Sequence, residues 1–177
     1  MLLKNMVVKA AQRGVGLVEV LVALLVLAIG VLGYAGMQLS ALKGAEQANN
    51  RAQATLIAQD ALERLQVNPN LPAYIAAAWP TTPAAVGSAP NAYATCTGVG
   101  AGCSSAQMVS WDVNQLSWMA GNLLPEGLVA IQSCPNSRLN CVVVSWDGMK
   151  PSECVKAGGE VNTDTDSFCA VIEVLRY

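Results

Sequence analysis

Residues 14–42 read GVGLVEVLVALLVLAIGVLGYAGMQLSAL, and this stretch decides the fold. From Val20 to Leu42 there are 23 consecutive residues without a charge. As an α-helix, at about 1.5 Å per residue, they would extend about 35 Å, which is enough to cross a bilayer core of about 30 Å. We therefore expect a helix that spans a membrane.

The residues before this run set its orientation. Lys4, Lys9 and Arg13 precede it without any acid, which predicts that the N-terminus lies on the cytoplasmic side. A secretory signal would have a shorter apolar region, of about 7–15 residues, followed by a small-residue cleavage site. Ala28-Ile29-Gly30 and Gly33-Tyr34-Ala35 fit such a site loosely, but both lie inside the run. The run therefore fits a secretory signal poorly. A secreted protein that has lost this run is kept as an alternative.

Glu19 places an acid at the front edge of the apolar run. A carboxylate inside a membrane helix costs about 2.5–3.5 kcal/mol to insert, so we expect it to have a partner. If the chain were cut after Gly14, Val15 would carry a new ammonium group one helical turn before Glu19. Glu19 could then pair with the terminal ammonium of a neighbouring copy. The alternative is that it is tolerated, unpaired, near the lipid headgroups.

The lysine-containing leader, Arg13-Gly14, and the string from Val15 through Glu19 resemble the class III signal of type IV pilins and type II secretion pseudopilins. The resemblance implies that prepilin peptidase cleaves after Gly14 and methylates Val15, and that Glu19 serves in assembly. Two positions differ from the usual signal. The first mature residue is usually phenylalanine but is Val15 here, and Gly16 replaces a threonine or serine. The phrase EVLVALLVLAIGVLGYAGMQ is most similar to minor pilins and nearly as similar to I-type pseudopilins.

This resemblance implies a location and a set of partners. Residues 1–14 would be a cytoplasmic leader, 15–42 a transmembrane and assembly helix, and 43–177 a periplasmic head. A minor pilin helps to initiate or prime type IV pili, the fibres of adhesion and twitching motility. Its partners would be prepilin peptidase, the inner membrane, other minor pilins and pilin subunits, and a tip adhesin. The alternatives are an I-type pseudopilin of a type II secretion system and, less well supported, a Sec-secreted disulfide-bonded binding protein.

Composition excludes several other classes of protein. The 177 residues carry a formal charge of -2 and are 53% hydrophobic and 12% charged, which argues against disorder. The ten lysines and arginines form no basic stripe, so no nucleic-acid partner is expected. There is no histidine, which removes Ser-His-Asp and Cys-His catalysis. Ser152 near Lys150 and Lys156 is only a weak hint of catalysis, and we expect no enzyme.

The helix is expected to continue beyond the membrane. From Lys43 to Val67 apolar residues recur at spacings near three and four, and Asn68-Pro69 then ends the helix. A helix over residues 15–67 would have 53 residues and extend about 80 Å. The expected buried face of its second half consists of Ala45, Ala48, Ala52, Leu56, Ala58, Leu62 and Leu65. Gly30, Gly33 and Gly36 are either sites of close helix packing or a hinge.

The remainder predicts a small α+β head. Residues 71–101 are expected to be irregular, with a turn of helix around 72–79. A second helix is expected over 104–122, capped by Ser104 or Ser105, with Met108, Trp111, Leu116 and Met119 facing inward. Strands are expected over 128–133, 141–146 and 170–177. An antiparallel sheet backed by the long helix gives a pilin-like lollipop.

The six cysteines all follow the apolar run, and none forms a CxxC pair. Without histidine and without close cysteine spacings, a zinc site is disfavoured and disulfides are expected. Six cysteines allow 15 connectivities. We expect the sequential pairs Cys96–Cys103, Cys134–Cys141 and Cys154–Cys169, because Cys134 and Cys141 adjoin two predicted strands. In the family that the motif resembles, a disulfide-bounded C-terminal loop often lies at a subunit contact.

Asn162, Asp164 and Asp166 place oxygen-bearing side chains at alternate positions of the C-terminal loop. A calcium loop of the EF-hand type also needs a glycine and a glutamate at fixed positions, and both are missing. We interpret these residues as solvated loop residues and expect neither a metal site nor a cofactor.

Overall fold

The computed structural model describes residues 14–88, 96, 100, 102–156, 158–162, 164 and 166–174. The expected leader, residues 1–14, lies outside the described residues except for Gly14. The chain divides into two compact units, Met1–Ala45 and Glu46–Tyr177, and each is described by itself.

Helix α1 (Leu17–Val67) has 51 residues, and its part up to Ala45 belongs to the first unit. It begins two residues later than predicted, because glycine at positions 14 and 16 favours the helix poorly. The Gly16 carbonyl accepts the first hydrogen bonds, from the amides of Glu19 (3.0 Å) and Val20 (3.3 Å). In the first unit the helix continues without a break through Gly30, Gly33 and Gly36.

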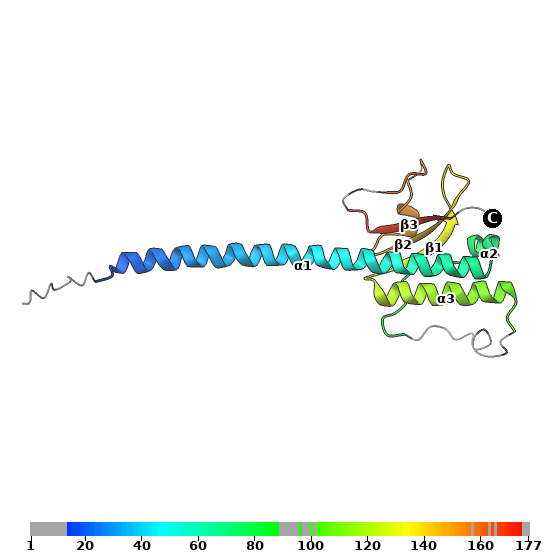
Figure 1. The fold of residues 1–177 in the computed structure, drawn as a ribbon, viewed down its shortest axis with the longest axis horizontal. Helices are drawn as coiled ribbons and strands as arrows, with labels where there is room; N and C mark the ends of the chain where they lie inside the picture. The colour runs from blue at the N-terminus through cyan, green and yellow to red at the C-terminus, as the bar shows by residue number, and fades with distance from the viewer. Residues whose placement is uncertain are drawn as a thin grey trace, which may run out of the picture. The chain divides into compact units, whose positions relative to one another are not determined.

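The second unit contains a three-stranded antiparallel sheet in the order β1-β2-β3 (Figure 1). The strands are β1 (Leu128–Ser133), β2 (Asn140–Ser145) and β3 (Cys169–Val174). In the central strand, Val143 pairs with Ala130 of β1 and Val171 of β3. β2 lies one residue earlier than predicted, and the predicted end of β3, residues 175–177, lies outside the described residues. Every residue of β2 is buried, as expected of a central strand covered on both faces.

One face of the sheet packs on the second half of α1. The buried residues of α1 are Asn50, Ala54, Ile57, Ala58, Ala61 and Leu65, and the apolar ones join Val129, Val142, Val144 and Trp146 in one core. The predicted face was therefore only partly right. Ala45, Ala48, Ala52 and Leu56 are exposed, Leu62 is half-buried, and Ala58 and Leu65 are buried as predicted. Alanines occur on both sides of this helix, so periodicity alone did not fix which side faces the sheet.

Helices α2 (Leu71–Ala76) and α3 (Ser105–Leu123) complete the helical layer (Figure 1). The N-cap of α3 is Ser104, whose hydroxyl accepts from the amide of Gln107 in a capping box. The predicted inward face of α3 was only partly right: Leu116 is buried, and Met119 packs against the same core. Met108, Trp111 and Met119 are half-buried, whereas Val109, Asp112, Val113 and Ala120 are buried.

The opposite face of the sheet has a second, smaller core. Two disulfides, Cys134–Cys141 and Cys154–Cys169, pack there around Val143, covered by the segment that contains the 3-10 helix η1 (Pro151–Glu153). A third disulfide joins Cys96 to Cys103. All three have the sequential pairing that we expected. The prediction of an α+β fold, with a long helix on a small antiparallel sheet, is confirmed.

Candidate assembly site

The start of α1 carries the residues that the sequence singled out for processing and assembly. Gly14, Val15 and Gly16 precede the helix, and Glu19 lies in its first turn. All four are exposed. None of the ion pairs among the described residues includes Glu19. An exposed carboxylate at this end of the helix can therefore accept a cation that comes from another molecule.

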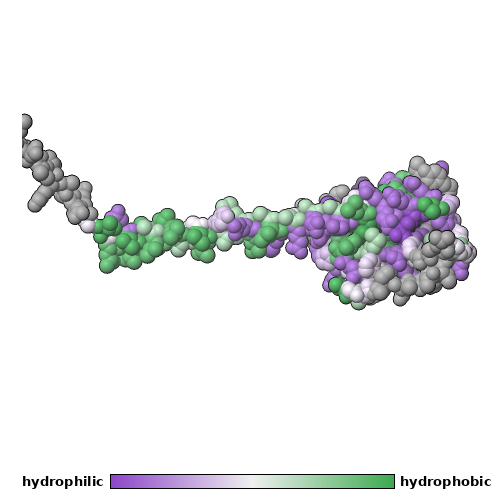
Figure 2. Space-filling model, turned by 60° about the horizontal axis from the view of Figure 1, so that its bottom comes forward, coloured by the Kyte–Doolittle hydropathy of each residue, from purple (hydrophilic) through white to green (hydrophobic). Residues whose placement is uncertain are grey.

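The helix that follows Glu19 exposes an unusually apolar surface. The large apolar side chains from Leu17 to Leu42 are between 48% and 76% exposed. An 18-residue window of α1 has a mean hydropathy of 2.6, and none of it is buried. Figure 2 shows hydrophobic surface along this part of the helix. By length and composition the helix can cross a membrane, and exposed apolar surface of this extent calls for lipid or other helices around it.

A buried polar network holds the other half of α1 in the second unit. An Arg64 guanidinium nitrogen lies 2.8 Å from a carboxylate oxygen of Asp112 on α3, and another lies 3.0 Å from Asp60. The hydroxyl of Tyr74, on α2, donates to the second oxygen of Asp112. Arg64 also stacks over Trp111, with 5.1 Å from Cζ to the ring centroid. Asp112 thus joins all three helices.

The network shifts the ionisation of two of its members. Burial, followed by the hydrogen bond to Asp112, raises the pKa of Tyr74 well above its ordinary value. Burial alone would lower the pKa of Arg64, but its hydrogen bonds to Asp112 and Asp60 raise it overall. Both groups therefore keep their protons at neutral pH, so that the tyrosine donates and the arginine stays charged.

Two family models match adjoining segments of the chain. Residues 9–35, which include Gly14, Val15 and Glu19, match the prokaryotic N-terminal methylation motif. Residues 36–114 match the Tt1218-like model, described as type IV pilin Tt1218. Together the two matches cover residues 9–114 and make the chain similar to type IV pilins over this part. No curated protein and no solved structure matches it.

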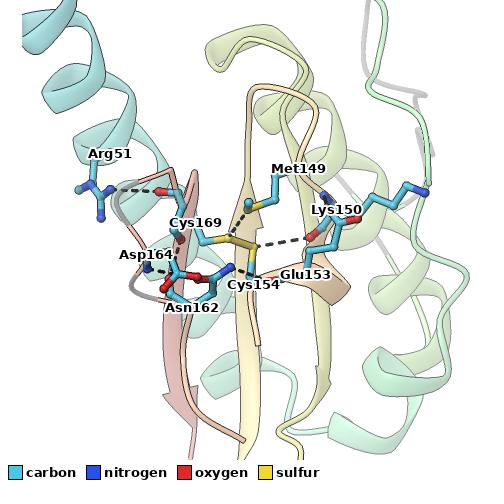
Figure 3. Close-up of a disulfide and its surroundings, with 9 residues drawn as sticks. Arg51, Met149, Lys150, Glu153, Cys154, Asn162, Asp164 and Cys169 are labelled. Carbon is cyan, nitrogen blue, oxygen red and sulfur yellow. Dashed lines mark hydrogen bonds between the residues drawn. A yellow bond between two sulfur atoms is a disulfide. The ribbon is translucent and has the colours of Figure 1, made fainter. Parts of the chain in front are cut away.

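In this pilin-like protein a second contact ties α1 to the C-terminal disulfide loop, residues 154–169. Arg51 on α1 donates to the carbonyl of Ser167 (3.2 Å), as Figure 3 shows, and its Cζ lies 5.8 Å from the ring centroid of Trp146. Trp146 in turn meets Phe168 edge to face, with 6.2 Å between ring centroids. The loop is thus held against α1.

The disulfide Cys154–Cys169 closes this loop (Figure 3). Its Cys169 sulfur lies 3.1 Å from the sulfur of Met149, and the Cys154 sulfur lies 3.6 Å from the carbonyl oxygen of Lys150. Cys154 is fully buried and Cys169 almost so. The bond is therefore part of the second core, not an exposed clip.

Asn162 and Asp164 are engaged with neighbouring residues of the same segment. Asn162 donates to the carbonyl of Glu153 and accepts from the amide of Asp164, whose carboxylate pairs with Lys156 at 3.1 Å. Within the described part of the chain, no group of three histidine, cysteine or acidic residues is placed to hold a metal ion. Asp164 has a lysine as its partner, which accounts for it without a cation.

Arg51 and Asp112 were not among the residues that the sequence predicted to be functional. Asp112 is the single charged residue of α3, and a lone acid in a helix with apolar periodicity was a signal that it could be buried and paired. Arg51 had no such signal, because an arginine on a half-exposed helix is ordinary. Its partner is a backbone carbonyl 116 residues away in the chain.

Proposed function

We propose that this protein is a minor pilin that helps to initiate or prime the assembly of type IV pili. Prepilin peptidase cleaves it after Gly14 and methylates Val15, and α1 then carries it from the inner membrane into the filament. The head folds in the periplasm, where its disulfides form. Its partners are other minor pilins, pilin subunits and a tip adhesin, and its final location is the pilus at the cell surface.

The observation that carries this proposal is an exposed acid at the start of an exposed apolar helix. In a bilayer or a helix bundle the carboxylate of Glu19 would cost about 2.5–3.5 kcal/mol without a partner. Cleavage after Gly14 creates an ammonium group at Val15 on every subunit. Glu19 of one subunit then neutralises the terminal amine of its neighbour, and both charges are matched inside the bundle.

The assignment to minor pilins rests on resemblance in the helix. Residues 19–38 resemble the minor pilin PilV, the type IV pilus modification protein, and nearly as closely the I-type pseudopilin of type II secretion. The match to a type IV pilin model over residues 36–114 supports a pilus over a secretion system.

The N-terminus of the protein isolated from membranes tests the processing step. We expect Edman sequencing or mass spectrometry to find Val15 as the first residue, with or without a methyl group. A bulky substitution such as Gly14→Trp should leave the uncleaved chain. A wild-type protein that retains Met1, or that begins inside the apolar run, contradicts the proposal.

Glu19→Ala tests the assembly step. The variant should still be cleaved, because the cleavage site is unchanged, but it should no longer co-purify with other pilins or support piliation. Glu46→Ala is the matched control, since Glu46 is an exposed acid of the same helix outside the apolar run. Normal piliation with Glu19→Ala would show that the carboxylate has no role in assembly.

A further inference from the structure

Strand β3 forms one edge of the sheet, and its pairing with β2 shows which of its backbone groups face β2. The amide of Trp146 donates to the carbonyl of Phe168 (3.1 Å), which continues the β2–β3 pairing by one residue. Hydrogen-bonded and non-hydrogen-bonded pairs alternate in an antiparallel ladder. The backbone groups of Ala170, Ile172 and Val174 therefore point toward β2.

The same alternation turns the backbone groups of Cys169, Val171 and Glu173 away from β2, toward the free edge. Among the described residues, no hydrogen bond to the outward amides or carbonyls of Val171 and Glu173 is present. β1, the other edge, is next to α2 and α3, which contact it. β3 is thus the edge at which the described structure leaves a row of donors and acceptors without a protein partner.

An open pocket of about 530 Å³ adjoins the end of this edge. Glu173 contributes to its wall, and the other residues are mainly apolar: Leu62, Leu65, Pro69, Leu71 and Val174, with Gln66. The outward backbone groups of β3 therefore lie next to an apolar hollow between β3 and the end of α1. Backbone groups followed by a side-chain pocket are the two components of strand addition to a sheet edge.

The charge at this edge specifies the partner further. Glu173 is exposed, and it forms none of the ion pairs found among the described residues. A residue placed opposite Glu173 by an added strand would lie on the same face of the sheet, with about 4.5–5.5 Å between Cβ atoms. A lysine or arginine there is favourable, whereas an acid is not.

We propose that the free edge of β3 binds an extended strand of a partner protein. The strand adds to the outward groups of Val171 and Glu173, places a basic residue opposite Glu173, and inserts an apolar side chain into the pocket beside Val174. This goes beyond the proposed function, because it involves neither the leader nor Glu19, and either can fail without the other.

A second copy of this chain fits the edge less well. Two β3 strands related by a two-fold axis at Val171 would place Glu173 of each opposite Cys169 of the other. Both carboxylates would then lack a cation. The charge therefore favours a different protein with a basic, alternating strand.

The test uses the full chain in detergent micelles and a synthetic probe. The probe is a capped six-residue peptide of alternating valine and threonine with one central lysine, and its control has glutamate in place of lysine. Residue-specific amide exchange by NMR should show that the lysine peptide slows exchange at Val171 and Glu173 at least about tenfold. Exchange at Ala170 and Ile172 should not change, because β2 already protects those amides.

Reversing the charge at Glu173 distinguishes binding at this site from nonspecific binding. Glu173→Lys should weaken binding of the lysine peptide about threefold to tenfold and strengthen binding of the glutamate peptide by a similar factor. Glu160→Lys, an equal change at another exposed acid, should alter neither. Because Glu173 is exposed, the variant should fold, and an unchanged amide spectrum elsewhere in the sheet verifies this.

Four results would overturn the proposal. The first is no saturable binding of the lysine peptide, and the second is binding without protection of Val171 and Glu173. The third is equal affinity of both peptides for the wild type. The fourth is protection of these two amides in the free protein, which would show that the chain's own residues or a second copy already cover the edge.

Discussion

Arg64 and Asp112 lie 48 residues apart in the chain, yet the guanidinium of one and the carboxylate of the other are 2.8 Å apart. Asp112 is only 4% exposed at its side chain, whereas Arg64 is 20% exposed and keeps Asp60 as a second partner. Asp112 therefore depends more on this ion pair than Arg64 does. The end of α1 is attached to α3 through a group that is costly to leave unpaired.

Asp112→Ala is expected to destabilise the head by about 2–4 kcal/mol, because it leaves the Tyr74 hydroxyl and one side of Arg64 without a partner. Chemical unfolding of the full chain in detergent, followed by tryptophan fluorescence, measures this change. Asp60→Ala removes the more exposed partner of the same arginine and should cost less than about 1 kcal/mol. Equal effects of the two variants would contradict the central place of Asp112.

The raised pKa of Tyr74 predicts a loss of stability in alkaline solution. In the folded state the phenol keeps its proton, whereas in the unfolded chain it loses it near pH 10. The unfolded state therefore binds fewer protons above pH 10, and the free energy of unfolding falls by up to about 1.4 kcal/mol per pH unit. Unfolding at pH 9 to 11 should show this slope in the wild type and a shallower one in Tyr74→Phe. Tyr34→Phe, in the exposed apolar helix, should retain the wild-type slope.

The features that sequence predicted best are those encoded by neighbouring residues. The N-terminal methylation motif, the length of the apolar run and the end of α1 before Pro69 all depend on local sequence. The pairing of Cys134 with Cys141 also followed, because these cysteines adjoin two strands of one hairpin. Such features do not depend on how distant segments meet.

The features that sequence predicted poorly depend on contacts between distant segments. Periodicity assigned Leu56 to the buried face of α1, but Ala54 and Ile57 are buried instead. Since alanines occur on both sides of this helix, the contact with the distant sheet decides which side is buried. In α3, Trp111 was expected to face inward, and Asp112 was not among the residues expected there. The structure buries Asp112 because Arg64 and Tyr74 satisfy it, and neither partner is near it in the sequence.

Loss of the disulfide Cys154–Cys169 should destabilise the head by about 3 kcal/mol, the loop-closure value for a loop of this length. Replacing both residues by serine also puts two hydroxyls in the second core, which adds to the cost. Thermal unfolding of the double variant measures the loss. The double variant at Cys96 and Cys103 is the comparison. It should lose less stability, because both cysteines are half-buried and the loop that they close is shorter. A smaller effect at Cys154 and Cys169 would contradict the structural role of the buried bond.

Gly159 fits closely against the turn between β1 and β2, and its neighbour Gly158 does not. Gly159 has a φ of +84°, and a Cβ atom added there would lie 2.1 Å from the carbonyl oxygen of Pro135. At Gly158 an added Cβ would meet nothing within 4 Å. Gly159→Ala should therefore move the disulfide loop away from this turn and cost at least about 2 kcal/mol.

Gly158→Ala supplies the control for this prediction, since it makes the same chemical change one residue away and should shift the free energy of unfolding by less than about 0.5 kcal/mol. Amide exchange gives a second measure, because displacement of the loop should speed exchange at Asn162, whose amide donates to the carbonyl of Cys154 (2.8 Å). The Arg51 contact to Ser167 lies in the same loop, so the variant should also loosen the loop from α1. Equal stability of the two alanine variants would show that Gly159 does not hold the loop against Pro135.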